Sequence, residues 1–533
     1  MNTQPYVFEK RWFMLDFARM RRLHRGEMIN LLDILRRSGY NGLGLYVEGA
    51  FALPGTRGLP RPGCLTQEDI DFIREACRAR GITLFPLTNT VYHMEHFLTQ
   101  ERYAYLRDTG PHERYQLRFD HPDAKAFLME RLHALAAMFG TDFLHVGGDE
   151  AVLPPERLPE YAAFVGDLCR TLLDEGITPA VWGDMFYGKP ALAPYLPRET
   201  VIFDWYYGGH RPDSLRFFRE QGFREVIPCP CDDGWSHFIN RQQSNQGDPR
   251  PVSPDEIEAF LADGAKAGCA GGLMTHWEDI NGHNLWANLV PVVRAGLFMS
   301  GRWDPSTPEE AQVEPILFGR VTPYTRVTHL LRDTTTAPGR FPWHLPSHAV
   351  IHAELALRML VSPEGRFGTR FEDYERGADA ASALLDAWQP ANDVEDQAKR
   401  AMTAVVAAVR ASREMIRLAG SRDLWHQAAE EQFADGQNDP DGIFKEDLEQ
   451  FLLRIDCARR AHKAAADAFL AGIEGTGISD IPVRIQKKLL AMLDELYDRV
   501  SAFLTDPGLK DTAIPAWYEL VTGWLPTTGG LVT

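Results

Sequence analysis

Over its first 300 residues the chain alternates short apolar runs with longer amphipathic segments. Near-continuous apolar runs are typical of parallel strands buried on both faces, and the amphipathic segments between them are typical of helices. Eight such strand–helix units over roughly 300 residues match the size of a (β/α)8 barrel. The runs that we predict to be strands are Trp12–Phe17, Gly42–Val47, Ile82–Leu87, Asp142–Val146, Thr178–Trp182, Val201–Trp205, Glu225–Pro228 and Cys269–Thr275.

Helix start and stop signals separate these runs. Thr66 precedes an apolar-periodic segment with Asp69 three residues later, which predicts a capped helix that ends at Gly81. Similar signals predict helices over 122–140 and from 253–256 onward. A doubly wound open sheet is the competing fold, but it would need a glycine-rich phosphate turn after the first strand, and the sequence has none there.

The pattern changes after the eighth run. Residues 306–345 are rich in Pro and Thr and predict a linker or irregular layer. Residues 346–533 place Ala and Leu at helical spacing without a convincing strand, which predicts a bundle of four or five long helices. We therefore expect an α/β fold, with a (β/α)8 TIM barrel over 1–305, a linker over 306–345 and an all-α domain over 346–533.

Composition places the chain among ordinary globular proteins. Apolar residues make up 44% and charged residues 24% of its 533 positions, which excludes disordered, collagen-like and disulfide-scaffold classes. Asp and Glu outnumber Lys and Arg by 74 to 56, and a net charge of −18 disfavours nucleic acid and anionic membranes as partners. The sequence shows no signal-peptide pattern and no apolar stretch of about 18 residues, so we expect a cytoplasmic protein.

No cofactor or metal is expected. The seven cysteines are scattered, and the lone C-x-C at 229–231 has no second pair at zinc-site spacing. The two histidines within 93–96 suggest a metal only weakly, because the first strand lacks a matching H-x-H pair. The segment 437–448 resembles a calcium loop but lacks its first Asp and its final Glu.

Polar and aromatic residues follow nearly every predicted strand. The carboxyl ends of the strands of a (β/α)8 barrel meet at one mouth, where active sites lie. Aromatic rings stack on apolar faces of a pyranose and carboxylates bind its hydroxyls, so this convergence predicts a sugar pocket. The residues are Asp16, Arg19, Glu48, Thr88, His93, Glu95, Asp149, Glu150, Trp182, Asp184, Asp204, Trp205, Tyr206, Tyr207, Asp232, Asp233, Trp235, Trp277, Glu278 and Asp279.

The fourth strand end, HVGGDE, carries the sharpest signal. Two glycines let the backbone leave the strand, and Asp149 and Glu150 follow at once. Two carboxylates beside a glycosidic bond can act as proton donor and as stabiliser of the developing positive charge. Burial near aromatic rings and a neighbouring negative charge would both raise the pKa of the donor.

This string resembles the His-x-Gly-x-Asp-Glu signature of family 20 glycoside hydrolases, the β-N-acetylhexosaminidases. FMLDFAR, LYVEGAF, TNTVYHMEH, VWGDMF, FDWYY and MTHWED resemble the first, second, third, fifth, sixth and eighth strand ends of that family. The likeness covers about residues 8–300 and is closest to the branch with a helical C-terminal domain. It departs from that branch at Tyr92, where glycine is usual, which puts the shape of the pocket in doubt.

The resemblance implies substrate-assisted catalysis. Glu150 would protonate the leaving oxygen and later activate water, while the substrate's own acetamido oxygen attacks the anomeric carbon. Asp149 would orient the acetamido N–H and stabilise the oxazolinium ion. A tyrosine would hold the acetamido oxygen, with Tyr206 as first choice and Tyr207 as second. Arg19 would bind the hydroxyls of the sugar, and Asp279 would bind its 4- and 6-hydroxyls. Three tryptophans would form the walls of the N-acetyl pocket and cover the sugar face. They are Trp182, Trp205 and Trp277, and the further expected substrate-binding residues are His93 and Asp184.

Trp235, after the seventh predicted strand, either caps this pocket or packs in the core. The expected activity is that of an exo-acting, retaining β-N-acetylhexosaminidase on terminal GlcNAc or GalNAc of a glycan or glycoconjugate. Two alternatives stay open, a catalytically silent glycan-binding barrel and a retaining β-glycosidase with a protein nucleophile. The Ala-rich faces of the C-terminal helices suit either a homodimer contact or a bundle core.

Overall fold

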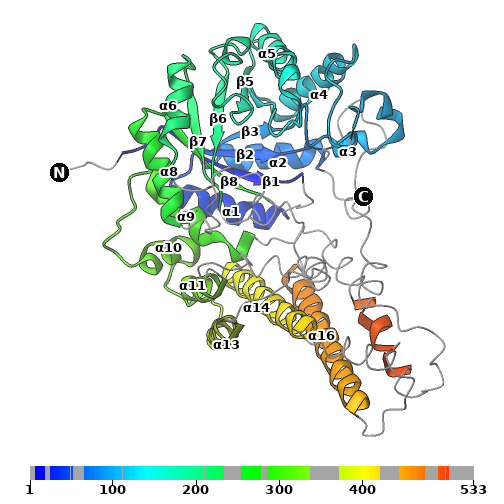
Figure 1. Cartoon of the computed structure of the whole chain (residues 1–533). Coiled ribbons are helices and arrows are strands. Elements are labelled where there is room, and N and C mark those ends of the chain that lie inside the picture. Colours follow the sequence, from blue (N-terminus) through cyan, green and yellow to red (C-terminus); the bar gives the residue numbers. More distant parts are fainter. Residues whose placement is uncertain are drawn as a thin grey trace.

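The structure is a computed structural model of the whole chain. It describes residues 6–18, 24–48, 50–51, 65–110, 112–207, 210–232, 254–277, 285–335, 371–420, 443–473, 490–491, 493–498 and 500–502. A barrel occupies the first part of these residues, and long helices extend away from it in the last part (Figure 1).

Eight parallel strands form a single sheet in the described part of the chain, in the order β7-β6-β5-β4-β3-β2-β1-β8. The sheet closes between β7 and β8, where Cys231 bridges to Thr275 and Asp232 N–H donates to the Thr275 carbonyl (3.0 Å). The predicted (β/α)8 fold is therefore confirmed. The strands are β1 (Lys10–Asp16), β2 (Gly42–Tyr46), β3 (Thr83–Leu87), β4 (Phe143–His145), β5 (Thr178–Trp182), β6 (Val201–Trp205), β7 (Val226–Cys229) and β8 (Gly271–His276).

Helices cover the outside of the barrel, and the predicted caps hold two of them in place. Thr66 and Asp69 cap α2 reciprocally, and Gly140, at a φ of 60°, ends α4. The α-helices are α1 (Arg25–Ser38), α2 (Gln67–Arg78), α3 (Glu95–Leu98), α4 (Ala124–Phe139), α5 (Leu158–Asp174), α6 (Pro212–Glu220), α8 (Pro254–Lys266) and α9 (Leu289–Met299). Short 3-10 turns are η1 (Glu101–Leu106), η2 (Pro155–Arg157), η3 (Ala193–Tyr195) and η4 (Leu285–Ala287).

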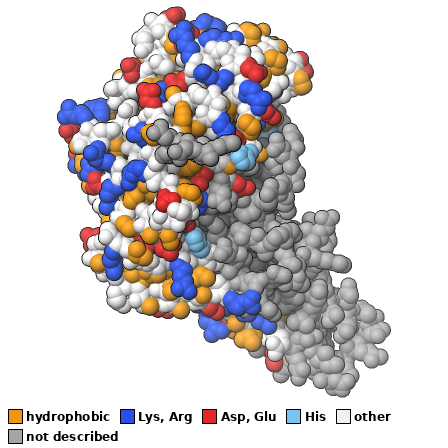
Figure 2. All heavy atoms as spheres, turned by 90° about the vertical axis from the view of Figure 1, so that its left-hand side faces the viewer, with side chains coloured by type: hydrophobic (Ala, Val, Ile, Leu, Met, Phe, Trp, Pro, Cys, Tyr) orange, Lys and Arg blue, Asp and Glu red, His pale blue; other side chains and the backbone are white. Residues whose placement is uncertain are grey.

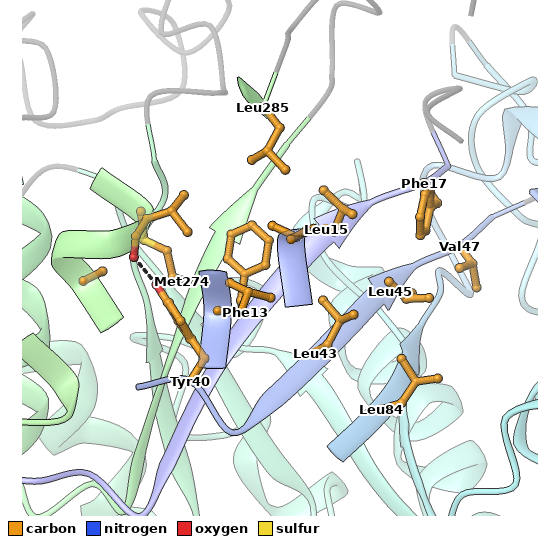
Figure 3. Packing of buried hydrophobic residues seen from close by; sticks show 14 of the residues in the cluster. Phe13, Leu15, Phe17, Tyr40, Leu43, Leu45, Val47, Leu84, Met274 and Leu285 are labelled. Atoms are coloured by element: carbon orange, nitrogen blue, oxygen red, sulfur yellow. Dashed lines mark hydrogen bonds between the residues drawn. The ribbon is translucent and has the colours of Figure 1, made fainter. Parts of the chain in front are cut away.

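The barrel has two cores because successive side chains of a strand point to opposite faces. On β1, Trp12 and Met14 fill the barrel interior, whereas Phe13 and Leu15 pack under the surrounding helices. Figure 3 shows the outer core, in which Phe13 and Leu15 lie among side chains from β2, β3 and β8. Both faces of the strands are therefore apolar, which explains their near-continuous apolar runs.

Gly42 of β2 makes room for Trp12 in the inner core. A Cβ at position 42 would lie 2.1 Å from Trp12 Cδ1. We expect Gly42→Ala to lower the free energy of unfolding by about 1–3 kcal/mol, because the indole must move inside a filled barrel. Chemical denaturation measures this, with Gly26→Ala on α1 as the matched control, since nothing lies within 4 Å of a Cβ there. Equal stability of the two variants would contradict the prediction.

The predicted linker or irregular layer over 306–345 is wrong for most of that segment, because it is helical. Helices α10 (Glu309–Phe318) and α11 (Tyr324–Thr335) lie there and pack on the barrel. Pro315 lies inside α10, but two other prolines of this segment stand at helix starts. Pro308 is the N-cap residue of α10, and the Pro323 carbonyl accepts the first hydrogen bond of α11. Proline is well tolerated at such positions because the first turn of a helix needs no N–H donor. Residues 336–345 lie outside the described part.

The described residues of the C-terminal region are helical except in the short connection at 388–392. The region contains α13 (Phe371–Ala387), α14 (Asp393–Gly420) and α16 (Ile443–Ile473), with α14 and α16 side by side (Figure 1). The Ala-rich faces of these two helices pack inside the chain and form a bundle core. Their buried alanines include Ala401, Ala408, Ala411, Ala458 and Ala465.

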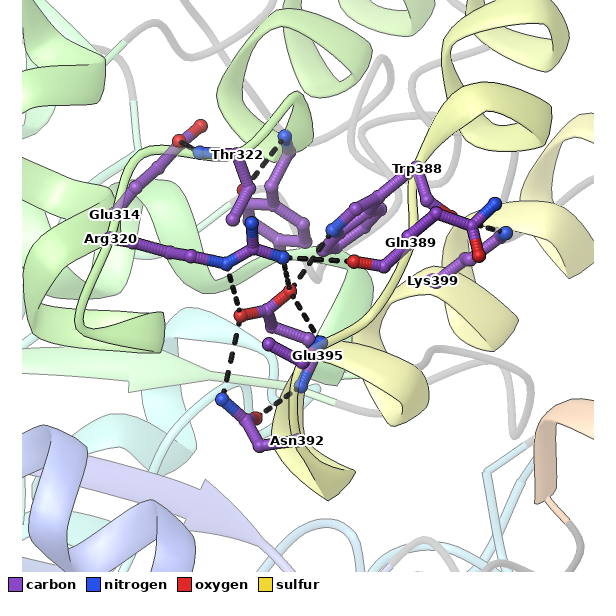
Figure 4. A network of polar contacts seen from close by, with 10 residues as sticks. Glu314, Arg320, Thr322, Trp388, Gln389, Asn392, Glu395 and Lys399 are labelled. Atoms are coloured by element: carbon purple, nitrogen blue, oxygen red, sulfur yellow. Dashed lines mark hydrogen bonds and ion pairs between the residues drawn. The ribbon is translucent and has the colours of Figure 1, made fainter.

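A polar network joins the first turn of α14 to the chain segment between α10 and α11 (Figure 4). The fully buried Glu395 carboxylate accepts hydrogen bonds from Arg320 Nε (2.8 Å) and Nη2 (2.5 Å). Trp388 Nε1 (3.1 Å) and the Ala391 N–H (3.1 Å) donate to the same carboxylate. The hydrogen bonds from Arg320 lower the pKa of Glu395 and keep it charged.

Acidic and basic side chains are interspersed over the described residues of the face drawn in Figure 2. None of the described helices is both long and apolar enough to cross a membrane.

Candidate active site

The carboxyl end of β4 turns sharply and carries two acids into the barrel mouth. Gly147 and Gly148 have positive φ values of 75° and 88°, and Glu150 has one of 50°. A Cβ at Gly147 would lie 2.5 Å from Asn89 Oδ1, so only glycine fits against the end of β3. Asp149 and Glu150 are partly buried at the tip of this turn.

The left-handed backbone of Glu150 is held from the neighbouring strand. Its N–H donates to Asp184 Oδ2, after β5, over 3.0 Å. His93, after β3, also has a positive φ of 56°, and its Nε2 lies 3.0 Å from Glu150 Oε2 and 3.8 Å from Asp149 Oδ2. Non-glycine residues with this backbone cluster at functional sites, where surrounding contacts hold the strain. Three adjacent strand ends therefore converge on one pair of acids.

The carboxyls of Asp149 and Asp184 lie in an environment that disfavours charge. Burial raises the pKa of Asp149, and the charges of Asp184 and Glu150 add to the rise while His93 opposes it. Burial and the charge of Glu150 likewise raise the pKa of Asp184. Oδ1 of Asp149 is buried without a hydrogen-bond partner. Carboxyls whose pKa is raised by burial and by neighbouring charges are candidates for functional groups.

Aromatic rings surround these acids. Trp182, which ends β5, lies 5.8 Å from Trp277 after β8, measured between ring centroids. Trp205, which ends β6, lies 5.2 Å from the Tyr207 ring, and Trp277 Nε1 donates to the Tyr207 hydroxyl over 2.8 Å. Nε1 of Trp182 is buried without a hydrogen-bond partner. The structure thus brings together the three tryptophans that the sequence suggested as walls.

Tyr206, the first-choice tyrosine, points away from this mouth. Its ring lies 5.9 Å from Phe260 of α8 and 4.7 Å from the Arg211 guanidinium, on the outer side of the barrel. Strand alternation explains this, because Trp205 faces the interior and the next side chain faces the helices. The structure therefore places Tyr206 among the surrounding helices and Tyr207 at the mouth, where its hydroxyl accepts a hydrogen bond from Trp277.

Tyr46 and Asn89, to which the sequence analysis assigned no role, lie next to the site residues Glu48 and Trp277. The Tyr46 hydroxyl, at the end of β2, donates to Glu48 Oε1 (2.6 Å) and accepts from Asn89 Nδ2 (2.6 Å). The Tyr46 ring lies edge-on to Trp277 with centroids 5.0 Å apart. Their positions directly at or after strand ends could have placed them in the candidate set.

His145 of the HVGGDE string has a structural role. It is fully buried, and burial lowers its pKa to about 3, so the ring is neutral. Its Nδ1 accepts the Gly147 N–H (3.1 Å), and its ring lies 4.4 Å from Trp182. It supports the turn that carries the two acids.

Three expected binding residues, Arg19, Trp235 and Asp279, lie outside the described residues. Of the calcium-like segment 437–448, residues 437–442 also lie outside the described residues, and the rest belongs to the first turns of α16.

Donor atoms of His93, Asp149 and Glu150 lie within 4.8 Å of one another and could together hold a cation. The two thiols of the C-x-C are buried and donate hydrogen bonds to the backbone. Cys229 Sγ donates to the Ile227 carbonyl, and Cys231 Sγ donates to the Asp232 carbonyl.

No protein-family model matches the chain, and no curated protein matches its sequence. Among solved structures it is similar to a β-N-acetylhexosaminidase from Bacteroides fragilis NCTC 9343, with 18% identity over 58% of this chain and 69% of that chain and a TM-score of 0.44. It is also similar to a GH20 exo-β-N-acetylglucosaminidase from Vibrio harveyi, with 17% identity over 58% of each chain and a TM-score of 0.44. A Streptomyces plicatus β-hexosaminidase shows 18% identity over 58% of this chain and 68% of that chain, again with a TM-score of 0.44. The chain thus spans 58–69% of the length of these three enzymes.

Proposed function

We propose that this protein is a family 20 glycoside hydrolase, an exo-acting β-N-acetylhexosaminidase that releases terminal GlcNAc or GalNAc with retention of configuration. The observation that carries the proposal is the arrangement of Glu150 and Asp149 at one barrel mouth, with His93 beside both acids. The tryptophan walls supply stacking surfaces for a pyranose.

In this proposal Glu150 is the general acid. It donates its proton to the glycosidic oxygen as the bond from that oxygen to the anomeric carbon breaks. The substrate's acetamido oxygen forms the new bond to the anomeric carbon and gives a bicyclic oxazolinium ion. Glu150, now a carboxylate, takes a proton from the water that opens this ion, so two inversions leave the β-configuration unchanged.

Asp149 and Tyr207 act on the acetamido group. The Asp149 carboxylate accepts the acetamido N–H and offsets the positive charge that develops there. Oδ1 of Asp149 is buried without a partner, and a buried acceptor of this kind gains a full hydrogen bond when a donor arrives. Tyr207 replaces Tyr206 as the donor to the acetamido oxygen, because its hydroxyl lies beside Trp277 at the mouth.

A panel of nitrophenyl glycosides tests the proposal. We expect turnover of the 2-acetamido-2-deoxy-β-glucoside or β-galactoside, no turnover of the β-glucoside, and inhibition by a thiazoline analogue of the oxazolinium ion. Binding of N-acetylglucosamine without any turnover would favour a silent glycan-binding barrel. Turnover of the β-glucoside that thiazoline leaves unaffected would favour a protein nucleophile.

The two neighbouring tyrosines offer a matched pair of variants. Tyr207→Phe should lower kcat by about 10²–10³, the range for a lost donor to a developing charge. Tyr206→Phe should leave kcat within a few-fold of the unsubstituted protein, because that hydroxyl lies on the outer side of the barrel. Steady-state kinetics on the nitrophenyl acetamido sugar measures both, and the reverse order of effects would overturn the assignment of Tyr207.

A further inference from the structure

A tyrosine that the proposed chemistry does not use stands next to the proposed general acid. Tyr92 follows β3 and is only partly buried. Its ring lies edge-on to the ring of His93, with centroids 4.8 Å apart. His93 Nε2 lies in turn 3.0 Å from Glu150 Oε2. A single imidazole therefore separates the Tyr92 ring from the carboxyl that donates the proton.

A second loop segment holds Tyr92 in place. The Tyr115 ring lies in a stacked orientation to the Tyr92 ring, at 6.5 Å between centroids. Backbone hydrogen bonds join the two segments on both sides of Tyr92. The Leu117 N–H donates to the Val91 carbonyl (2.7 Å), and the Met94 N–H donates to the Tyr115 carbonyl (2.9 Å). A ring that is fixed in this way loses little side-chain freedom when a ligand packs on it.

The strand order places Tyr92 and the proposed walls on different sides of the two acids. β4, which carries the acids, lies between β3 and β5 in the barrel. Tyr92 follows β3, whereas Trp182 ends β5 and Asp184 follows it. A general acid stands at the boundary between the sugar that is released and the leaving group, because it protonates the oxygen that joins them. With the released sugar against Trp182, the leaving group extends past Glu150 toward β3.

A carboxylate oxygen near Tyr92 is available as a hydrogen-bond acceptor. Oε2 of Glu95, at the start of α3, is buried, and no described residue donates to it. Burial raises the pKa of Tyr92 to about 12, and the charges of Glu150 and Glu95 add to this rise, so both carboxyls lie near the Tyr92 hydroxyl. A buried acceptor without a donor gains a full hydrogen bond when a ligand hydroxyl arrives. An aromatic ring beside such an acceptor suits a pyranose.

We infer that Tyr92 is a specificity-determining residue that, together with Glu95, forms the subsite for the sugar on the leaving-group side of the cleaved bond. The Tyr92 ring stacks on an apolar face of that pyranose, and the Glu95 carboxylate accepts one of its hydroxyls. The substrate is then an oligosaccharide rather than the glycoside of a small alcohol. This inference rests on the proposed function, because it names the substrate class of the same site. Glycine, which is usual at position 92 in the branch that the sequence resembles, offers no such ring.

The test compares Tyr92→Ala with the unsubstituted chain on three β-glycosides of N-acetylglucosamine, or of N-acetylgalactosamine if the nitrophenyl panel favours that sugar. Their leaving groups are a β-1,4-linked N-acetylglucosamine, nitrophenol and methanol. We expect kcat/KM to fall about 3–30-fold for the two leaving groups that contain a ring, the range for a lost aromatic contact. It should stay within two-fold for the methyl glycoside.

The thiazoline inhibitor shows whether Tyr92→Ala disturbs the acids themselves, because this inhibitor occupies only the part of the site that holds the released sugar. Its Ki should stay within two-fold of the value for the unsubstituted chain. An unchanged kcat/KM for the disaccharide would overturn the inference. So would an equal fall for the methyl glycoside, or an equal rise of the thiazoline Ki.

Two further variants separate the ring from the carboxylate. Tyr92→Phe keeps the ring and removes only the hydroxyl, which lies 3.1 Å from His112 Nδ1, so kcat/KM should stay within a few-fold. Glu95→Ala should lower kcat/KM about 3–30-fold for the disaccharide, the range for a lost hydrogen bond. It should leave the nitrophenyl glycoside within two-fold, because nitrophenol brings no further hydroxyl to the subsite. Equal falls in Tyr92→Phe and Tyr92→Ala would overturn stacking on the ring.

Tyr105→Ala is the matched control. Tyr105 belongs to η1, in the same connection between β3 and α4, and it is 49% exposed. Its ring lies edge-on to a histidine as well, at 5.3 Å between centroids, but this histidine is His121 and not a residue of the site. All three glycosides should keep their kcat/KM in this variant. A loss equal to that of Tyr92→Ala would overturn the inference.

The inference and the proposed function fail in different ways. If the unsubstituted chain turns over none of the three glycosides, the proposed hydrolase activity fails, and calorimetric affinity then replaces kcat/KM. A disaccharide that binds more tightly than N-acetylglucosamine, by a margin that Tyr92→Ala removes, would still support the subsite. Equal affinities for the two sugars, or no binding of either, would overturn the subsite as well.

Discussion

Glu150→Gln is expected to abolish turnover of β-N-acetylhexosaminides that have poor leaving groups. The amide occupies the same space beside His93 but cannot donate a proton to the glycosidic oxygen. General acid–base catalysis contributes about 10²–10⁴-fold in rate, and the whole of this contribution is lost when the leaving alkoxide needs the proton. A glycoside with an activated phenol as leaving group should lose much less, since that leaving group departs without protonation.

Steady-state kinetics on a poor and an activated glycoside measures this difference. Glu175→Gln is the matched control, because Glu175 is an exposed carboxylate that pairs with His133 on the outside of the barrel. It should leave both rates unchanged. A Glu150→Gln variant with the turnover of the unsubstituted protein on both substrates would end the assignment of Glu150 as the acid.

Asp149→Asn is expected to lower kcat by about 10²–10⁴, the range for a lost group that stabilises charge in the transition state. The neutral amide can still meet the acetamido group, but it cannot offset the charge of the oxazolinium ion. The effect should be large even with an activated leaving group, which distinguishes Asp149 from Glu150. Kinetics on the same two substrates checks this. Equal losses in the two variants on both substrates would contradict the division of roles.

The pH profile gives a second measurement of Asp149. Its carboxyl must be ionised to act, so activity rises with pH as the proton leaves. Burial and the charges of Asp184 and Glu150 raise the pKa of Asp149, which moves this acidic limb to higher pH than an ordinary aspartate would give. Asp184→Asn removes one of those charges and should move the limb to lower pH. If the acidic limb of the pH–activity profile stays in place in Asp184→Asn, or persists unchanged in Asp149→Asn, the limb does not report the ionisation of Asp149.

The order of strands and helices was predictable because it depends on local patterns. Strands buried on both faces must be apolar nearly throughout, so each strand of the barrel was visible as a run, and Thr66 with Asp69 marked the start of α2. The segment at 306–345 was not predictable in the same way. A high proline content suggests irregular structure, but Pro308 and Pro323 stand directly before α10 and α11, where proline is compatible with a helix.

For the site, the sequence by itself determined which residue types gather at the mouth, since every parallel strand of a barrel delivers its last residues to the same end. It placed Asp149 and Glu150 at a glycine turn and tryptophans at the ends of neighbouring strands. Only the tertiary structure decided which of Tyr206 and Tyr207 faces inward, because one residue of shift at a strand end moves a side chain to the opposite face. It alone brought His112 to the Tyr92 hydroxyl, because a contact between two loop segments depends on how the loops fold and leaves no periodic trace in the chain.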